Sequence, residues 1–371
     1  MLKGEVMTGR PQKIIVIVVF LILAAGLLCL YSSCHQKGIF IRKEIFTKQL
    51  FWMGAGIGAL FLVSRLDYRR LLIIISPLYW ISFLSLLFVL ILGRTIMGAQ
   101  RWISLGDFSF QPSELGKFAL ILALAKYFSQ KNIQDIQISI RSANLFKGLL
   151  VPLGMTLLLT ALVLVQPDLG TAIVYLFIFL SLGFLAGMPF RYIVGFLVTG
   201  LLSLPFFWHF LKDYQKSRLL VFLNPNIDPL GAGYTVIQSK IAIGSGQFFG
   251  KGWMAGTQSQ LNFLAERHTD FIFSVWGEEW GFLGSMVLLF LYGLLIFLIL
   301  RVAEFAKDTF GRLLAVGVAS LLFFHVFVNI AMNIGTSPIV GLPLPLISYG
   351  GSSLLINLIG IGIVLNIARQ K

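Results

Sequence analysis

Repeated apolar stretches of about 18 to 25 residues constrain this chain more than any other feature, because a helix of about 20 residues crosses the hydrocarbon core of a bilayer. Of its 371 residues, 57% are apolar and only 12% are charged. A water-soluble helical core would need far more polar surface than this composition supplies. We therefore expect an all-α integral membrane protein with one polytopic domain over residues 1–371.

Ten stretches are predicted to span the membrane. They lie near residues 14–31, 49–64, 71–93, 113–128, 148–165, 170–187, 191–211, 271–299, 312–334 and 350–368. The stretches at 113–128 and 170–187 are the weakest, and the first of them contains Glu114, Lys117 and Lys126.

The distribution of basic residues predicts the orientation of these helices. With the N-terminus in the cytoplasm, the inner segments hold 16 of the 29 Lys and Arg residues. The outer loops hold seven once the long loop at 212–270 is set aside, since long loops cross largely regardless of charge. The loop at 32–48, with four basic residues outside, runs against this count. We expect cytoplasmic N- and C-termini and a long extracytoplasmic loop between the seventh and eighth helices.

The net charge of +14 alone excludes few classes of partner. Nucleic acid is excluded by the distribution of the basic residues, which are scattered over short loops and form no stripe. Most of it fits positive-inside charge and snorkelling at helix ends, and the rest could line a site for an anionic lipid head group. Cys29 and Cys34 match no metal motif, and a disulfide between them stays an open alternative.

Polar residues gather in four places, all on the outer side of the predicted topology. In residues 98–117, Glu114 and Lys117 share a helix face, either as a local ion pair or as charges facing an internal cavity. In residues 166–171, Asp168 is predicted to cap the next helix. Residues 238–244 in the long loop resemble a short interfacial helix with Lys240 on its polar side. Residues 343–352 are rich in Pro and Gly and predict a re-entrant or broken segment, either buried in protein or lining a watery cavity.

Asp270 is the strongest single candidate. It ends an ionisable run at 266–270 and directly precedes Phe271 and a membrane span, where charge is costly and is a functional-site hypothesis by default. The competing interpretation is an N-terminal helix cap.

Seven short segments, most of them in these polar regions, together resemble the SEDS family (shape, elongation, division and sporulation), bacterial proteins that polymerise lipid II into glycan strands. The matching segments are 100–102, 111–117, 166–171, 228–234, 238–246, 266–273 and 343–352, in family order. Residues 250–264 resemble the rod-elongation members most, although Ala265 stands where a proline is expected.

The resemblance implies an inverting glycosyl transfer, in which an acceptor hydroxyl attacks a donor that releases undecaprenyl pyrophosphate. It implies that Asp270 is the catalytic base or a metal ligand. It makes Arg101, Lys117, Lys240 and Arg267 candidates for substrate phosphates, with Glu114 holding Lys117 or helping to bind metal. His268 is expected to be structural. A divalent cation (Mg or Mn) is a candidate cofactor, and no organic cofactor is expected.

The expected partners are the lipid II substrate, membrane lipid and a class B penicillin-binding protein, a transpeptidase, at the bacterial cytoplasmic membrane. Two other functions stay open: a lipid II flippase, which ten spans with broken helices would also suit, and a non-catalytic scaffold. The outward clustering of the polar segments favours the enzyme over the flippase.

Overall fold

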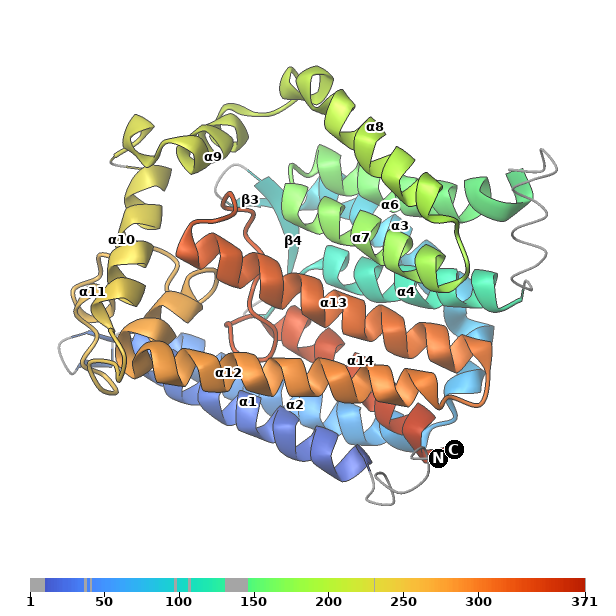
Figure 1. Ribbon diagram of the computed structural model, residues 1–371, viewed down its shortest axis with the longest axis horizontal. Coiled ribbons are helices and arrows are strands. Elements are labelled where there is room, and N and C mark those ends of the chain that lie inside the picture. The colour runs from blue at the N-terminus through green and yellow to red at the C-terminus, as the bar shows by residue number, and fades with distance from the viewer. Residues whose placement is uncertain are drawn as a thin grey trace.

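Long helices dominate the computed structural model, which describes residues 11–36, 39–40, 42–96, 99–105, 108–130, 146–229 and 231–370. The longer ones are α1 (Pro11–Ser33), α2 (Lys43–Arg65), α3 (Leu71–Leu92), α4 (Pro112–Ser129), α6 (Val151–Val165), α7 (Leu169–Leu185), α8 (Phe190–Trp208), α12 (Ile272–Glu304), α13 (Thr309–Ile334) and α14 (Gly351–Arg369). They lie alongside one another in one bundle, and the start of α1 and the end of α14 lie at the same end of it (Figure 1).

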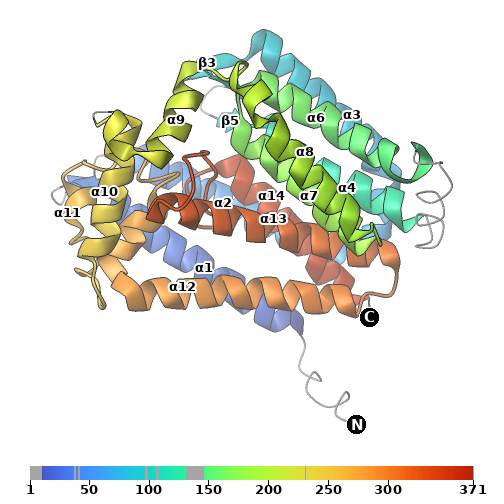
Figure 2. The ribbon, with the colours of Figure 1, turned by 45° about the horizontal axis from the view of Figure 1, so that its top comes forward.

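The long loop between α8 and α12 folds into short helices. They are α9 (Asp213–Leu223), α10 (Ala232–Ser245) and α11 (Thr257–Gln260), with a 3-10 turn η3 (Pro225–Ile227) between the first two. They sit together at the end of the bundle opposite the start of α1 (Figures 1 and 2). The helix predicted at 238–244 is confirmed as part of α10, which is longer.

In the described part of the chain, eight helices are long and apolar enough to cross a membrane, against the ten that the sequence predicts. Every predicted range is helical, but α4 carries three charged side chains and α7 has only 17 residues. Both helices pack inside the bundle, and most residues of α4 are buried. Burial in protein explains how α4 tolerates charges that a lipid-facing helix would not.

Short strands make the fold less purely helical than expected. Strands β1 (His35–Gln36) and β2 (Ile39–Phe40) form one antiparallel pair. Strands β3 (Arg94–Ile96), β4 (Ala99–Leu105) and β5 (Phe108–Phe110) form a three-stranded antiparallel sheet before α4. The remaining turns are η1 (Tyr68–Arg70) and η2 (Phe146–Leu150).

Helix α14 fills the centre of the bundle, between α2 and α13, and nearly all of it is buried. None of the described side chains of helix α8 is buried, and the helix lies on the outside against α7 (Figure 2). The segment between α13 and α14 is irregular, which confirms the broken segment predicted at 343–352. Cys29 and Cys34 are both free and buried, so the disulfide alternative is wrong.

Candidate functional site

Asp270 stands just before α12, at the end of the bundle that carries α9 to α11. Its carboxylate does not cap that helix, because the N-cap residue is Phe271 and no side-chain cap bond forms. Within the described part of the chain, the Asp270 carboxylate accepts no hydrogen bond and forms no ion pair. The capping interpretation is therefore wrong, and this carboxylate is available for chemistry.

The backbone at Asp270 is held by side chains of α13. Asn329 and Asn333 both donate from Nδ2 to the Asp270 carbonyl oxygen, at 2.9 and 3.0 Å. Both asparagines are fully buried, and Asn333 also accepts from the Ser274 backbone N–H at 3.1 Å. A buried amide is costly unless it is hydrogen-bonded, so these contacts fix the start of α12 against the end of α13.

The segment before α14 holds the two preceding carbonyl groups. Ser348 donates from Oγ to the Thr269 carbonyl at 2.6 Å, and the Tyr349 N–H donates to the His268 carbonyl at 2.9 Å. Three successive carbonyl groups, at residues 268 to 270, are thus bonded to α13 or to the segment after it. The polar segments predicted at 343–352 and at 266–270 are therefore in contact, and the first supports the backbone of the second.

A small pocket opens beside this loop, between β4, the α6–α7 turn, α9 and the segment after α13. Arg101, Pro167, Tyr214, Arg218 and Val340 are among the residues that line it. The next residue, Gly341, has φ of 72°, and a Cβ atom there would lie 3.5 Å from Asp270 Oδ2 and 3.9 Å from Arg218 Nη1. The Asp270 carboxylate and the Arg218 guanidinium therefore flank the same backbone position.

Removal from water raises the pKa of Asp270 from its ordinary value of 3.8 to about 6. The positive charges of Arg218 and Arg101 oppose that rise, and the negative charges of Glu266 and Asp168 add to it. Asp270 is thus mostly ionised at neutral pH, yet holds a proton far better than an exposed aspartate. Such a pKa suits a general base.

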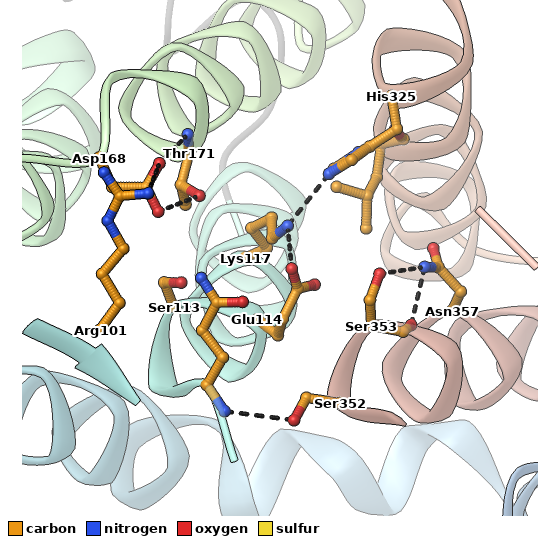
Figure 3. A network of polar contacts seen from close by, with 12 residues as sticks. Arg101, Ser113, Glu114, Lys117, Asp168, Thr171, His325, Ser352, Ser353 and Asn357 are labelled. Carbon is orange, nitrogen blue, oxygen red and sulfur yellow. Dashed lines mark hydrogen bonds and ion pairs between the residues drawn. The ribbon is translucent and has the colours of Figure 1, made fainter. Parts of the chain in front are cut away.

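Arg101 lies across the α6–α7 turn (Figure 3). It donates from Nε to the Gln166 carbonyl at 3.2 Å and from Nη2 to the Pro167 carbonyl, and its Nη1 lies 3.9 Å from Asp168 Oδ1. Asp168 accepts from the backbone N–H of Thr171, which confirms the predicted cap of α7. Arg101 therefore lines the pocket with most of its donors already used.

Glu114 and Lys117 form a buried cluster inside the bundle (Figure 3). Lys117 Nζ donates to Glu114 Oε1 at 2.7 Å and lies 3.0 Å from Nε2 of His325. His325 Nδ1 lies 2.8 Å from the Leu321 carbonyl and so carries the hydrogen, which leaves Nε2 to accept from Lys117. The 2.7 Å contact confirms the local ion pair predicted between Glu114 and Lys117. Lys117 has no exposed surface.

Lys240 and Arg267 lie away from the pocket. A Cβ atom at Gly335, the C-cap of α13, would overlap the end of the Lys240 side chain, so Lys240 covers that helix terminus. Arg267 is buried and donates from Nη1 to the Ser259 carbonyl, while its Nε has no partner. Burial, then the charge of Arg42, lowers the pKa of Arg267. Neither residue lines the pocket beside Asp270.

His268 is held by Arg42, whose Nη1 lies 2.8 Å from His268 Nδ1. Burial, then the charge of Arg42, lowers the pKa of His268 to about 4. His268 is therefore neutral at physiological pH and accepts a hydrogen bond from Arg42. This agrees with the structural role that the sequence predicts.

Sequence reasoning did not single out Arg218, Asn329 and Asn333. Arg218 lies in a polar run of the long loop, where nothing in the sequence distinguishes it from the neighbouring Lys216. The two asparagines are four residues apart in an apolar span, so they share a helix face, and that spacing could have revealed them. Over the described ranges, no group of three or more His, Cys, Asp or Glu side chains could hold a metal ion by itself.

Comparison with known proteins gives consistent matches. The FtsW/RodA/SpoVE family, described as cell cycle proteins, matches residues 12–371. Peptidoglycan glycosyltransferase MrdB of Escherichia coli K12 is 46% identical over 295 residues, 79% of this chain and 77% of that protein. Peptidoglycan glycosyltransferase RodA of Treponema pallidum is 35% identical, over 93% of this chain and 94% of that one.

Two solved structures are similar over nearly the whole chain. The crystal structure of the rod shape determining protein RodA of Thermus thermophilus has a TM-score of 0.70 and 34% identity, and covers 96% of each chain. A chain from a study of polymerization and crosslinking by a peptidoglycan synthase complex has a TM-score of 0.79 and 39% identity. That match covers 96% of this chain and 97% of the other.

Proposed function

Since this chain belongs to the FtsW/RodA/SpoVE family and is a peptidoglycan glycosyltransferase that polymerises glycan strands, we propose that Asp270 is the base of that transfer. The observation that carries the proposal is the unpaired Asp270 carboxylate, fixed by its backbone and placed beside Arg218. Among the described residues this carboxylate neither caps a helix nor forms an ion pair, which leaves its oxygens available to a substrate.

The proposed reaction joins two lipid II units with inversion at the donor sugar. The acceptor hydroxyl oxygen attacks C1 of the donor, the bond from C1 to the pyrophosphate oxygen breaks, and the hydroxyl proton passes to Asp270. The products are a longer glycan strand and undecaprenyl pyrophosphate. One carboxylate with a pKa near 6 is enough, because a single displacement needs no enzyme nucleophile.

Two arginines supply positive charge for the leaving pyrophosphate. Among the described residues, Arg218 has no hydrogen-bonded or ion-paired partner, and its guanidinium lies over the Tyr214 ring at 5.7 Å. It is therefore free to bind a phosphate, whereas Arg101 mostly shapes the pocket. Charge placed in advance where it develops in the transition state is commonly the largest catalytic contribution.

A divalent cation, Mg or Mn, would be held here by Asp270 together with the substrate, since the described residues offer no metal-binding group of their own. Asp270 would supply the protein oxygen and the pyrophosphate the others, because Mg²⁺ is commonly held by one or two carboxylates and substrate phosphates. Such an ion would add to the charge stabilisation of the leaving group.

We place the site at the outer face of the bacterial cytoplasmic membrane, with both chain termini in the cytoplasm and α4 and α7 completing ten spans in one domain. The start of α12, which directly follows the Asp270 loop, and the helices of the long loop share one end of the bundle, opposite the start of α1 and the end of α14 (Figure 1). The count of basic residues supports the termini as the cytoplasmic end.

A transpeptidase of the class B penicillin-binding type is the proposed partner. The similar structure from a peptidoglycan synthase complex concerns polymerization together with crosslinking, which supports this pairing. A polymerase beside a transpeptidase would deliver its new strand directly to the crosslinking site.

The test is polymerisation of labelled lipid II by purified protein reconstituted with such a transpeptidase. We expect long glycan strands from the wild type and none from Asp270→Asn, with normal strands from Asp213→Asn, an exposed aspartate on α9. Loss of activity with a chelator, and its return with Mg or Mn, would show that the transfer needs a divalent cation and would favour the metal-ligand role of Asp270 over that of a base acting alone. Near-normal polymer from Asp270→Asn would overturn the proposal, and lipid II crossing liposomes without polymer would indicate a flippase.

A further inference from the structure

We infer that a cleft between α1, α2 and α14, at the end of the bundle far from Asp270, binds the head group of one anionic phospholipid. The cleft has a volume of about 540 Å³, within the range of pockets that hold small organic ligands. Lys13, Arg65 and Arg369 line it, one from each of the three helices. Three separate elements thus bring cationic side chains to one hollow.

No described residue compensates the charge of these three cations. Within the described ranges, none of them lies within 4 Å of a carboxylate or makes a side-chain hydrogen bond. The nearest acid in sequence, Asp67, accepts from Gln370 Nε2 and from the Arg69 backbone N–H, both at 3.0 Å. Gln370 and the nearby arginines Arg69 and Arg70 lower the pKa of Asp67, so its charge is engaged outside the cleft.

Below the cations the cleft is apolar. Val16, Ile17, Phe61 and Leu365 form that part of the lining. Ile17 is 57% exposed and Phe61 is 41% exposed, on helices long and apolar enough to cross a membrane. Charge at the helix ends above an apolar lining matches a phospholipid, whose phosphate lies at the surface and whose acyl chains lie deeper.

This arrangement differs from ordinary positive-inside charge, which requires basic residues on the cytoplasmic side but does not require them to gather at one cleft. It also differs from a site for free phosphate, which would gain nothing from four apolar side chains. We therefore assign the site to a lipid. Placing it in the cytoplasmic leaflet rests on the proposed topology, but binding itself depends neither on that topology nor on catalysis.

The experiment is native mass spectrometry of the whole protein, equilibrated with equal amounts of phosphatidylglycerol and phosphatidylcholine. We expect one retained phosphatidylglycerol on the wild type. A basic side chain near a membrane surface contributes about fivefold to attraction of an anionic lipid. The triple variant K13Q/R65Q/R369Q should therefore lose retention by at least about tenfold.

Two further variants keep the result interpretable. The control K307Q/R191Q/R312Q removes the same charge from exposed positions that do not line the cleft, and should retain the lipid. Ile17→Trp fills the apolar part without changing charge, and should also release the lipid. It serves as the decisive variant if the triple variant does not fold, judged by its unfolding temperature in neutral detergent.

Equal retention of the two lipids by the wild type would overturn the inference, and so would equal loss from the cleft variant and the control. Displacement of the bound lipid by millimolar inorganic phosphate alone would show a soluble-anion site instead. Because the readout is a bound mass, Asp270→Asn should retain the lipid normally. Failure of the proposed catalytic role would therefore leave this inference intact.

Discussion

Asn329 and Asp270 are joined by a hydrogen bond of 2.9 Å from the side-chain amide of α13 to the backbone carbonyl of the residue that we propose as the base. Asn329 also donates to the Leu342 carbonyl at 2.7 Å. One amide therefore links the Asp270 loop to the segment between α13 and α14. Positioning of the Asp270 carboxylate depends on this link.

Replacing Asn329 with leucine should lower kcat by roughly 10- to 100-fold with little change in KM, because misplacing a catalytic group by about 1 Å can cost that much. The measurement is lipid II polymerisation over a range of substrate concentrations. Asn357→Leu is the matched control, since Asn357 is also buried but bonds only within α14, to Ser353. Equal losses from the two variants would contradict the positioning role.

The rate should depend on pH through Asp270. Its base form is lost as pH falls through its pKa of about 6, so kcat/KM should rise with pH and level off above about 7. His268 cannot produce this inflection, because its pKa is lowered to about 4. A pH–rate profile of the wild type between pH 5 and 8 measures it, and a flat profile would exclude Asp270 as the titrating base.

Asp270→Asn should stabilise the folded protein at neutral pH. Burial raises the pKa of Asp270, so the folded chain binds the proton more tightly than the unfolded chain. The resulting stability is complete below the ordinary carboxyl pKa near 4 and is lost as pH rises through about 6. At pH 7.5 we expect Asp270→Asn to have a larger free energy of unfolding than the wild type, by about 1 kcal/mol after solvent screening, and so a higher unfolding temperature. At pH 4 the two proteins should unfold at the same temperature.

Thermal unfolding in detergent at the two pH values measures this difference, with Asp213→Asn as the exposed control. A lower unfolding temperature for Asp270→Asn at pH 7.5 would mean that the carboxylate stabilises the fold. That result would restore a structural role for Asp270.

Removing charge from Arg218 should slow the transfer. Arg218→Gln loses a donor aimed at the leaving pyrophosphate, and we expect kcat/KM to fall by about 10²- to 10³-fold, the usual effect of losing one such donor. Lys216→Gln on the same helix removes an equal charge that does not line the pocket. Activity of Arg218→Gln within threefold of this control would remove Arg218 from the reaction.

The buried pair of Glu114 and Lys117 should show strong coupling. Glu114→Gln or Lys117→Met alone leaves an uncompensated buried charge and should destabilise the protein by about 3–5 kcal/mol. The double variant should recover much of that loss. A double-mutant cycle of unfolding free energies measures the coupling, and additive losses would contradict it.

The same double variant also tests the substrate-binding role that the family resemblance implies for Glu114 and Lys117. If it is folded and polymerises normally, the pair serves the fold. If it is folded and inactive, the pair serves the reaction.

The sequence predicted the helices well because a membrane span must be apolar over about 20 consecutive residues, which is a local property of the sequence. It also singled out Asp270 as a candidate, since a carboxylate next to a membrane span is energetically costly. It could not show that Lys240 covers a helix end or that Arg267 is buried away from the pocket. A basic side chain looks the same in sequence wherever it points, and its surroundings come from helices distant in the chain.

The site's supports were hidden for the same reason. Asn329 and Asn333 are 59 and 63 residues from Asp270, and Ser348 is 79 residues from Thr269. Only the packing of α12, α13 and α14 brings them together. Arg218 belongs to yet another helix, α9, so no local pattern joins it to Asp270.

The three held carbonyl groups at residues 268 to 270 couple Asp270 to the rest of the bundle. Their donors belong to α13 and to the segment leading into α14, so a shift of one helix past the other would move the carboxylate relative to the pocket arginines. Loading of the outer surface of α13 would then be transmitted to the reaction centre as a change in distance. The distance between the proposed base and the pocket arginines is thus set by the packing of the core and not by the loop alone.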